Sequence, residues 1–375
     1  MLLTIILSVF LLSISWILLT YLISIDWKRS HKIKSGNFPN YENSKIQEYP
    51  ITNIVINDLK FRARILNPKA NGEAIFLLHG FPQTSISWEP VFEALKNTNF
   101  RVIAYDQRGY SPNARPKNVS DYDTKNLIDD LFSIATKLGI DKFHLVGHDW
   151  GAAIGWAATM SKPERILTYS ALSIPHPLAF FSALKNNKSQ RKKSRYILFY
   201  QIPWIPEMIL ISMNLFFLKR WIIHLMPHEH QKEYFSVFSE FGAMNSVLKY
   251  YRAMGKSKKF DYQPEIMLPV LFIWGNRDPA VSKDAVNLQD QFIQGYYKKI
   301  ELNTGHWLLE TATKEVVNHI TKHLDNKKNI KILKLSNIFL LSSIILSVTS
   351  FSGFLDQSSI WCDPPNKISP DLGNI

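Results

Sequence analysis

The stretch that decides the fold is Val146-Gly147-His148-Asp149-Trp150-Gly151-Ala152. It follows an apolar run at 143–146 and precedes a run of helical character at 152–160. This pattern predicts a sharp strand-to-helix turn of the form small-x-nucleophile-x-small, with Asp149 in place of the more usual serine. A carboxylate that attacks a saturated carbon forms an alkyl ester, which water can cleave, whereas a serine would form a stable ether. The turn therefore indicates chemistry on an electrophilic alkyl carbon, such as that of an epoxide or an alkyl halide.

Composition limits the class of protein. The chain has 375 residues, of which 46% are hydrophobic and 13% aromatic, enough for a large folded core. The formal net charge is +13, but no nucleic-acid-reading motif accompanies it, so an anionic membrane surface is the better explanation of the charge. The single cysteine, Cys362, excludes an intramolecular disulfide and any cysteine-based metal cluster.

Two apolar segments lie near the ends of the chain. Residues 1–25 contain no charged side chain and are long enough to cross a bilayer, which predicts a transmembrane anchor. The basic linker at 26–47 contains Lys28, Arg29, Lys32 and Lys34 near its start, so the following domain is expected in the cytoplasm, with the endoplasmic reticulum as the expected membrane. The segment 337–355 contains serines and could be a second span, an interfacial helix or a packed helix. The tail at 356–375 is expected to lack regular structure.

The remainder predicts an α/β fold with a mostly parallel sheet and an inserted helical lid. A hairpin with its turn at Asn57 and Asp58 opens the domain. The core is assigned to 48–174 and 260–326, and the proline-interrupted segment 175–259 to the lid. Expected strands cover 51–56, 60–66, 74–78, 101–105, 142–146, 166–172, 269–274 and 298–302, and expected helices 124–138, 282–292 and 313–324.

Two residues after later strands complete a candidate catalytic set. Asp278 lies in Gly275-Asn276-Arg277-Asp278-Pro279, and His306 lies in Gly305-His306-Trp307. The order Asp149, Asp278, His306 is nucleophile, acid, histidine, the order of a known hydrolytic triad. Either residue alone would be read as a turn aspartate or a structural histidine. Together with the turn at Asp149, they predict a catalytic site at the carboxyl edge of the sheet.

A loop after another strand predicts an oxyanion hole. His79-Gly80-Phe81-Pro82 directly follows the apolar run at 74–78. In this arrangement the loop supplies one backbone N–H to the oxyanion, and the residue after the nucleophile supplies the other. The expected donors are the amides of Phe81 and Trp150. The other histidines, including His144, His148 and His176, show no metal-ligand pattern and are interpreted as structural.

With these residues in view, the chain resembles the epoxide hydrolases of the α/β-hydrolase superfamily, and within them the membrane-anchored epoxide hydrolase 4-like group. The resemblance runs from about Ile51 to Leu324, and the second apolar segment departs from it. The matching motifs are specific in combination: residues 79–82, Asp106-Gln107-Arg108-Gly109-Tyr110-Ser111, residues 147–152, Asp278 and Gly305-His306-Trp307.

The resemblance implies two lid tyrosines that hydrogen-bond the epoxide oxygen, because an unassisted alkoxide leaves poorly. Tyr250-Tyr251-Arg252 matches the family's tyrosine-arginine motif and carries this role to Tyr251. Tyr196 matches the second tyrosine, with Tyr200 as a close competitor. The implied enzyme converts lipophilic epoxides to vicinal diols through an ester on Asp149. It uses water and needs neither cofactor nor metal.

Two other functions compete with this interpretation. A haloalkane dehalogenase also uses an aspartate at this turn, but Phe81 stands where that family often places a halide-stabilising asparagine, and the lid tyrosine pair favours an epoxide. A catalytically idle membrane scaffold of the same fold is the second alternative. It leaves the retention of every reactive residue unexplained.

Overall fold

The structure, a computed structural model, describes residues 7–8, 10–13, 15, 49–221, 223–254 and 263–325. No helix within these described ranges has the length and apolarity needed to span a bilayer. The predicted anchor at 1–25 lies largely outside the described residues. The linker at 26–47, the segment 337–355 and the tail lie entirely outside them.

The core is an eight-stranded sheet in the order β1-β2-β4-β3-β5-β6-β7-β8. The β1–β2 hairpin turns at Asn57, whose φ is 51°, and β2 pairs antiparallel with β4. The remaining pairs are parallel, so their carboxyl ends meet at one edge. The strands are β1 (Ile51–Ile56), β2 (Leu59–Leu66), β3 (Ala74–Leu78), β4 (Arg101–Tyr105), β5 (Phe143–His148), β6 (Ile166–Leu172), β7 (Val270–Gly275) and β8 (Tyr297–Leu302). The predicted mostly parallel sheet is confirmed.

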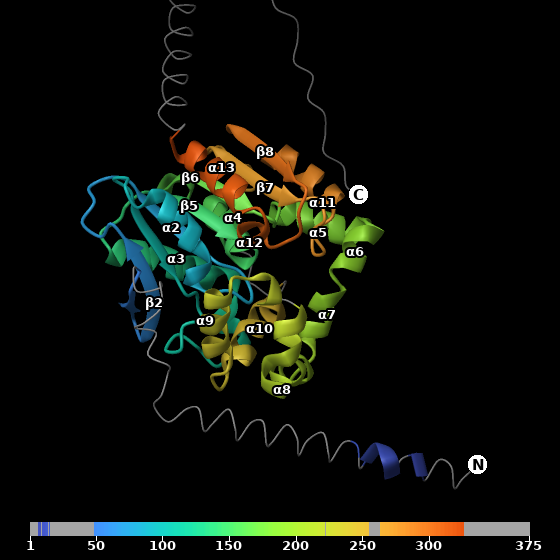
Figure 1. Cartoon of the computed structure of the whole chain (residues 1–375). Coiled ribbons are helices and arrows are strands. Elements are labelled where there is room, and N and C mark those ends of the chain that lie inside the picture. The colour runs from blue at the N-terminus through green and yellow to red at the C-terminus, as the bar shows by residue number, and fades with distance from the viewer. Residues whose placement is uncertain are drawn as a thin grey trace, which may run out of the picture. The chain divides into compact units, whose positions relative to one another are not determined.

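Helices cover both faces of the sheet, as a parallel sheet requires. On one face α2 (Glu89–Leu95) and α13 (Thr313–Asp325) bury apolar side chains together against the strands. On the other face α3 (Thr124–Lys137) and α4 (Trp150–Ser161) contribute to a larger core that continues into the lid. Figure 1 shows α2 and α13 together over the strands. The helix predicted at 282–292 is instead divided into α11 (Lys283–Leu288) and the 3-10 turn Gln289–Phe292.

The predicted strand-to-helix turn at residues 147–151, called the elbow from here on, forms where β5 ends and α4 begins. Both flanking glycines are required by close backbone approach. A Cβ on Gly147 would lie 2.3 Å from the Gly151 carbonyl oxygen, and one on Gly151 would lie 2.1 Å from the Leu78 carbonyl oxygen. These contacts explain why the pattern is small-x-Asp-x-small, and they press the turn against the end of β3.

The lid separates β6 from β7 and is helical, as predicted. Figure 1 shows α7, α8, α9 and α10 gathered on one side of the sheet-bearing core. Pro206 lies near the start of α8, and Pro227 caps α9, so these prolines mark helix starts. The lid helices are α5 (Pro177–Asn186), α6 (Lys188–Lys193), α7 (Arg195–Gln201), α8 (Ile205–Trp221), α9 (His228–Phe238) and α10 (Ala243–Ala253).

Candidate active site

Asp149 occupies the apex of the elbow in a rare backbone conformation. Its φ is 52° and its ψ is −119°, and it caps the N-terminus of α4. Few non-glycine residues adopt positive φ, and those that do concentrate at functional sites. The residue is only 7% exposed. Its carboxylate is therefore held at the amino end of a helix, where the helix dipole favours negative charge.

The structure brings the three predicted triad residues together. His306 Nδ1 lies 2.7 Å from Asp278 Oδ2, and His306 Nε2 lies 3.4 Å from Asp149 Oδ2. Asp278 is fixed by backbone N–H donation to Oδ1 from Ala280 at 2.7 Å and Val281 at 3.1 Å. The imidazole therefore has an orienting carboxylate on one nitrogen and the elbow carboxylate on the other.

Charge coupling sets the protonation of this site. Burial would lower the pKa of His306, but the carboxylates of Asp278 and Asp149 outweigh it and raise the pKa to about 10. Burial would raise the pKa of Asp149, but hydrogen bonding to His306 and the charge of His306 bring it below its ordinary value. In the free protein the site consequently holds an imidazolium between two carboxylates.

One predicted oxyanion donor already contacts the nucleophile. The Phe81 N–H donates to Asp149 Oδ1 at 2.8 Å. Trp150 is the first residue of α4, and the amides of a first helical turn have no partner within their own helix. The Phe81 amide thus already lies at the carboxyl group on which the oxyanion would form, and the Trp150 amide belongs to the residue that directly follows Asp149.

Both predicted tyrosines line the cavity that contains Asp149. Tyr196 and Tyr251 have ring centroids 6.0 Å apart, and Tyr251 packs against Trp150 at 5.0 Å. Burial and the nearby Asp149 charge raise the pKa of each phenol well above its usual value, which keeps both hydroxyls protonated as donors. Tyr200 also packs on Tyr251, at 4.8 Å, but it is not among the cavity-lining residues. The Tyr250 hydroxyl instead donates to the Arg108 carbonyl at 2.8 Å.

The cavity at Asp149 is apolar and lies to one side of the nucleophile. Its volume is about 330 Å³, and Asp149 is its only charged lining residue among those described. The lining comes from α3, α4, α5, α7, α10 and neighbouring turns, without residues of the 79–85 loop or of the His306 loop. Phe81, which lies outside this lining, packs against Tyr200, Phe238 and the cavity-lining Tyr251 at ring-centroid distances of 6.1 Å each.

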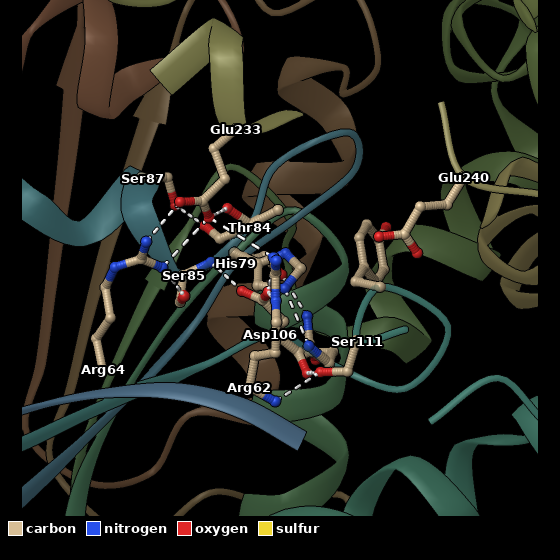
Figure 2. Close-up of polar contacts among 12 residues, drawn as sticks. Arg62, Arg64, His79, Thr84, Ser85, Ser87, Asp106, Ser111, Glu233 and Glu240 are labelled. Atoms are coloured by element: carbon tan, nitrogen blue, oxygen red, sulfur yellow. Dashed lines mark hydrogen bonds and ion pairs between the residues drawn. The ribbon is translucent and has the colours of Figure 1, made fainter. Parts of the chain in front are cut away.

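A buried ionic cluster ties the lid to the loop that carries Phe81. Figure 2 shows Glu233 of α9 facing Arg64 and Thr84, with Asp106 facing Arg62 and Ser85. Arg64 Nη2 lies 2.5 Å from Glu233 Oε2, and the Ser85 N–H donates to Asp106 Oδ1 at 2.7 Å. Burial would raise the pKa of Asp106, but Arg62, His79 and Arg64 lower it to about 2. The cluster fixes the position of α9 and the 79–85 loop together.

Sequence reasoning missed a second set of contacts behind His306. The His148 Nε2 lies 3.0 Å from the His306 carbonyl oxygen, and its Nδ1 lies 3.0 Å from the Gln83 amide. The other end of that amide lies 2.5 Å from Glu310 Oε1. The sequence pattern indicates only a structural role for His148 and no role for Gln83 or Glu310. Their one signal in the sequence is proximity to the selected motifs.

The fold and the aspartate elbow define a hydrolase of the α/β-hydrolase class, and the profile of the α/β hydrolase fold family matches residues 73–198. The chain is 31% identical to epoxide hydrolase 2 of Caenorhabditis elegans over 249 residues, which cover 64% of this chain and 70% of that protein. It is 29% identical to human epoxide hydrolase 4 over 261 residues, covering 66% of this chain and 70% of the relative.

Solved structures lead to the same group. The crystal structure of Bacillus megaterium epoxide hydrolase in complex with an inhibitor superimposes with a TM-score of 0.67 at 26% identity. It covers 73% of this chain and 100% of that one. The chain belongs to the epoxide hydrolase family of the α/β-hydrolase fold, and it is an enzyme of that family.

Proposed function

We propose that this enzyme opens lipophilic epoxides to vicinal diols through a covalent ester on Asp149. The observation that carries the proposal is the setting of one carboxylate. Asp149 accepts from the Phe81 amide at 2.8 Å, lies 3.4 Å from His306 Nε2, and opens onto an apolar cavity whose lining includes the phenols of Tyr196 and Tyr251. A nucleophile, a base, an oxyanion donor and proton donors thereby surround one reacting position.

In the first step, an Asp149 oxygen attacks an epoxide carbon and the carbon–oxygen bond of the ring breaks. Tyr196 and Tyr251 donate hydrogen bonds to the departing oxygen. One of them transfers its proton to that oxygen, which becomes the hydroxyl of a hydroxyalkyl ester, and the phenolate then regains a proton that the His306 imidazolium releases through solvent. Their raised pKa values keep the phenols protonated for this role. Two donors on the developing alkoxide stabilise the transition state more than the neutral epoxide.

In the second step, the ester changes the electrostatics of His306. Esterification removes the negative charge of Asp149, one of the two carboxylates that raise the pKa of His306. The pKa of the imidazole therefore falls once the ester forms, so His306 releases its proton and, now neutral, can accept a proton from water. Hydroxide adds to the ester carbonyl, and the oxyanion is held by the amides of Phe81 and Trp150. The carbon–oxygen bond to the alkyl group then breaks, the new carboxyl group gives its proton to the leaving alkoxide, and the diol departs from an Asp149 carboxylate beside a His306 imidazolium.

The one-sided cavity selects the substrate. Free volume extends along α4 toward Ala157 and Met160, whereas the Phe81 side is filled by aromatic rings. An epoxide with one apolar arm fits this shape, with the unsubstituted carbon toward Phe81. We expect 1,2-epoxyalkanes of increasing chain length to gain kcat/KM, and mid-chain epoxides with two long arms to be poor substrates.

The deciding experiment is a single turnover in ¹⁸O-labelled water with a terminal epoxyalkane, followed by peptide mass analysis. Label in the Asp149 carboxylate is expected, because water attacks the ester carbonyl. Label found only in the diol would mean direct attack by water and would refute the ester route. The variant His306→Gln should form the ester but not hydrolyse it, so the Asp149 peptide should become heavier by the mass of one epoxide molecule.

Haloalkane dehalogenation is tested with the same protein. Release of chloride from 1-chloroalkanes, with no turnover of the matched 1,2-epoxyalkanes, would replace the proposed function. An inactive protein toward both series, with its fold intact by circular dichroism, would favour the scaffold alternative.

We also propose that the enzyme belongs to the membrane-anchored epoxide hydrolase 4-like group, with its catalytic domain facing the cytoplasm from the endoplasmic reticulum. The uncharged run at 2–25 and the basic residues that follow it support this arrangement. Two lid side chains, Leu198 and Trp204, are 71% and 74% exposed and suit a nearby lipid surface. Protease added outside intact microsomes should digest the catalytic domain. A fully protected domain would contradict this topology.

A further inference from the structure

A chain of four polar groups runs behind the catalytic histidine. Glu310 of α12 (Leu308–Thr311) contacts Gln83, Gln83 contacts His148, and His148 contacts the backbone carbonyl of His306. Gln83 and His148 are completely buried. The second carboxyl oxygen of Glu310, Oε2, is buried and accepts no hydrogen bond from the described residues. None of these groups takes part in the ester mechanism above.

The hydrogen-bond donors and acceptors of these four groups determine their protonation states. The His306 carbonyl can only accept, so His148 Nε2 carries a proton. His148 is neutral, because burial and the adjacent His306 lower its pKa to about 4. Its Nδ1 is then an acceptor and needs a donor. The Gln83 amide oxygen, placed 3.0 Å from Nδ1, cannot be that donor, so the Gln83 amide must be rotated by 180° to present its NH₂ group.

Rotation of the Gln83 amide decides the state of Glu310. The Gln83 oxygen now faces Glu310 Oε1 at 2.5 Å and requires a donor from Glu310. Only the protonated acid supplies one. The alternative, a His148 imidazolium with a Glu310 carboxylate, holds the same number of protons. It places two separated charges in a buried site, one of them beside the His306 ring at a centroid distance of 5.1 Å. The neutral arrangement is therefore favoured.

We propose that Glu310 is a neutral carboxylic acid in the working enzyme and acts as a positioning residue for His306, by donating through Gln83 and His148 to the His306 backbone. The Ser173 hydroxyl also lies 3.1 Å from the His306 carbonyl oxygen, so two side chains hold this peptide group. Loss of the Glu310 proton removes the donor to Gln83. The amide must then turn back, and Nδ1 of His148 faces an acceptor.

The surroundings of Glu310 place this change in the physiological range. Burial is the largest influence on the pKa of Glu310 and raises it. The charge of His230 on α9, the side-chain contact with Gln83 and the charge of His306 act in the opposite direction, and Tyr234 on α9 also faces Glu310. His230 is itself paired with Glu89 of α2 at 2.7 Å. Burial outweighs these charges and raises the pKa of Glu310 to about 7. This chain of hydrogen bonds from Glu310 to the His306 carbonyl, called the relay from here on, is thus intact below pH 7 and is lost as pH rises above it.

The proposal rests on the proposed ester mechanism and predicts an effect on one half of it. Ester formation needs Asp149 and the tyrosines, whereas ester hydrolysis needs a correctly placed His306. The test measures both rates by rapid quench with a terminal epoxyalkane, for wild type, Glu310→Gln, Glu310→Leu and the exposed control Glu315→Gln on α13. A Gln side chain at 310 can donate to Gln83 as the neutral acid does, whereas Leu cannot.

Ester formation is expected to stay within about twofold in every variant. Below pH 7, Glu310→Gln and Glu315→Gln should hydrolyse the ester as wild type does, and Glu310→Leu should be about tenfold slower, the effect of one lost buried hydrogen bond. Above pH 7, wild type should slow toward the Leu variant, while Glu310→Gln stays fast. Equal slowing in the Gln and Leu variants would overturn the neutral-donor assignment, and wild-type hydrolysis in the Leu variant would overturn the positioning role.

A second readout does not depend on turnover. The infrared difference spectrum of wild type minus Glu310→Gln should contain the carbonyl band of a protonated carboxylic acid at pH 6, and this band should disappear by pH 9. Absence of the band at pH 6 would overturn the proposal. Failure of the ester mechanism is recognised separately, because no variant, including His306→Gln, would then accumulate an alkylated Asp149.

Discussion

Replacing Glu233 by Gln should destabilise the protein because it leaves a guanidinium buried without its counter-ion. The Arg64 side chain is 1% exposed and the Glu233 side chain 3% exposed, and the two form a close ion pair between β2 and the lid helix α9. The Thr84 hydroxyl donates to the same carboxylate at 2.5 Å. Removing one partner of such a pair costs about 3 to 5 kcal/mol. Because Gln keeps an oxygen that can accept a hydrogen bond, we expect a loss of about 3 kcal/mol.

Urea unfolding at pH 7, followed by circular dichroism, measures this loss. The matched control is Glu229→Gln on the same helix, whose partner Lys232 lies 2.9 Å away, with side chains 43% and 50% exposed. That variant should lose far less stability than Glu233→Gln, because water screens an exposed ion pair. The double variant Arg64→Met with Glu233→Leu should recover most of the loss, because apolar groups of similar volume replace a desolvated pair. Equal losses in Glu233→Gln and Glu229→Gln would refute the reasoning.

Three further predictions follow from the site. Replacing Asp149 by Asn should lower the pKa of His306 from about 10, as measured by NMR, and an unchanged pKa would contradict the charge coupling between the two residues. In the unmodified protein, the contribution of the His306 imidazolium to the free energy of unfolding is present below pH 6.5 and is lost as pH rises through about 10. The pKa of Glu310 is raised from 4.5 to about 7, so its neutral form stabilises the folded protein fully below pH 4.5. This contribution to the free energy of unfolding, about 3 kcal/mol, is lost as pH rises through 7. Urea unfolding at pH 5 and pH 8 should therefore show a steeper decline for wild type than for Glu310→Gln, and parallel declines would contradict this. Replacing Ala157 by Phe should raise KM for long 1,2-epoxyalkanes and leave a short epoxide unaffected, whereas equal effects on both would place the substrate arm elsewhere.

Much of the fold could be predicted because local patterns carry it. Strands β3, β4 and β6 begin and end at the predicted residues, since each is an apolar run bounded by turn residues. The hairpin turn at Asn57 was predicted from the same kind of signal. The helix α2 was not predicted, although its proline near the N-terminus is a helix-start signal. The predicted helix at 282–292 is α-helical only from Lys283 to Leu288 and continues as a 3-10 turn from Gln289 to Phe292.

The residues of the candidate site likewise divide into those that a local sequence motif predicts and those that no motif predicts. Asp149, Asp278 and His306 each stand in a motif directly after a strand, so chain order and the parallel sheet predict their meeting. The relay behind His306 has no such signal, because its contacts join residues far apart in the sequence. Gln83 and Glu310 are 227 positions apart, and His148 and the His306 carbonyl are 158 apart. Only the folded arrangement reveals which buried polar groups face each other.

The helix α4 starts at the residue after the nucleophile and also forms one wall of the cavity. Because an α-helix rises 1.5 Å per residue, Ala153 lies about 6 Å and Ala157 about 12 Å along its axis from Asp149. The helix therefore holds these cavity-wall residues at fixed distances from Asp149. A larger side chain at one of these positions would set the longest arm that reaches the nucleophile, so the enzyme's chain-length range can change without any change in its chemistry.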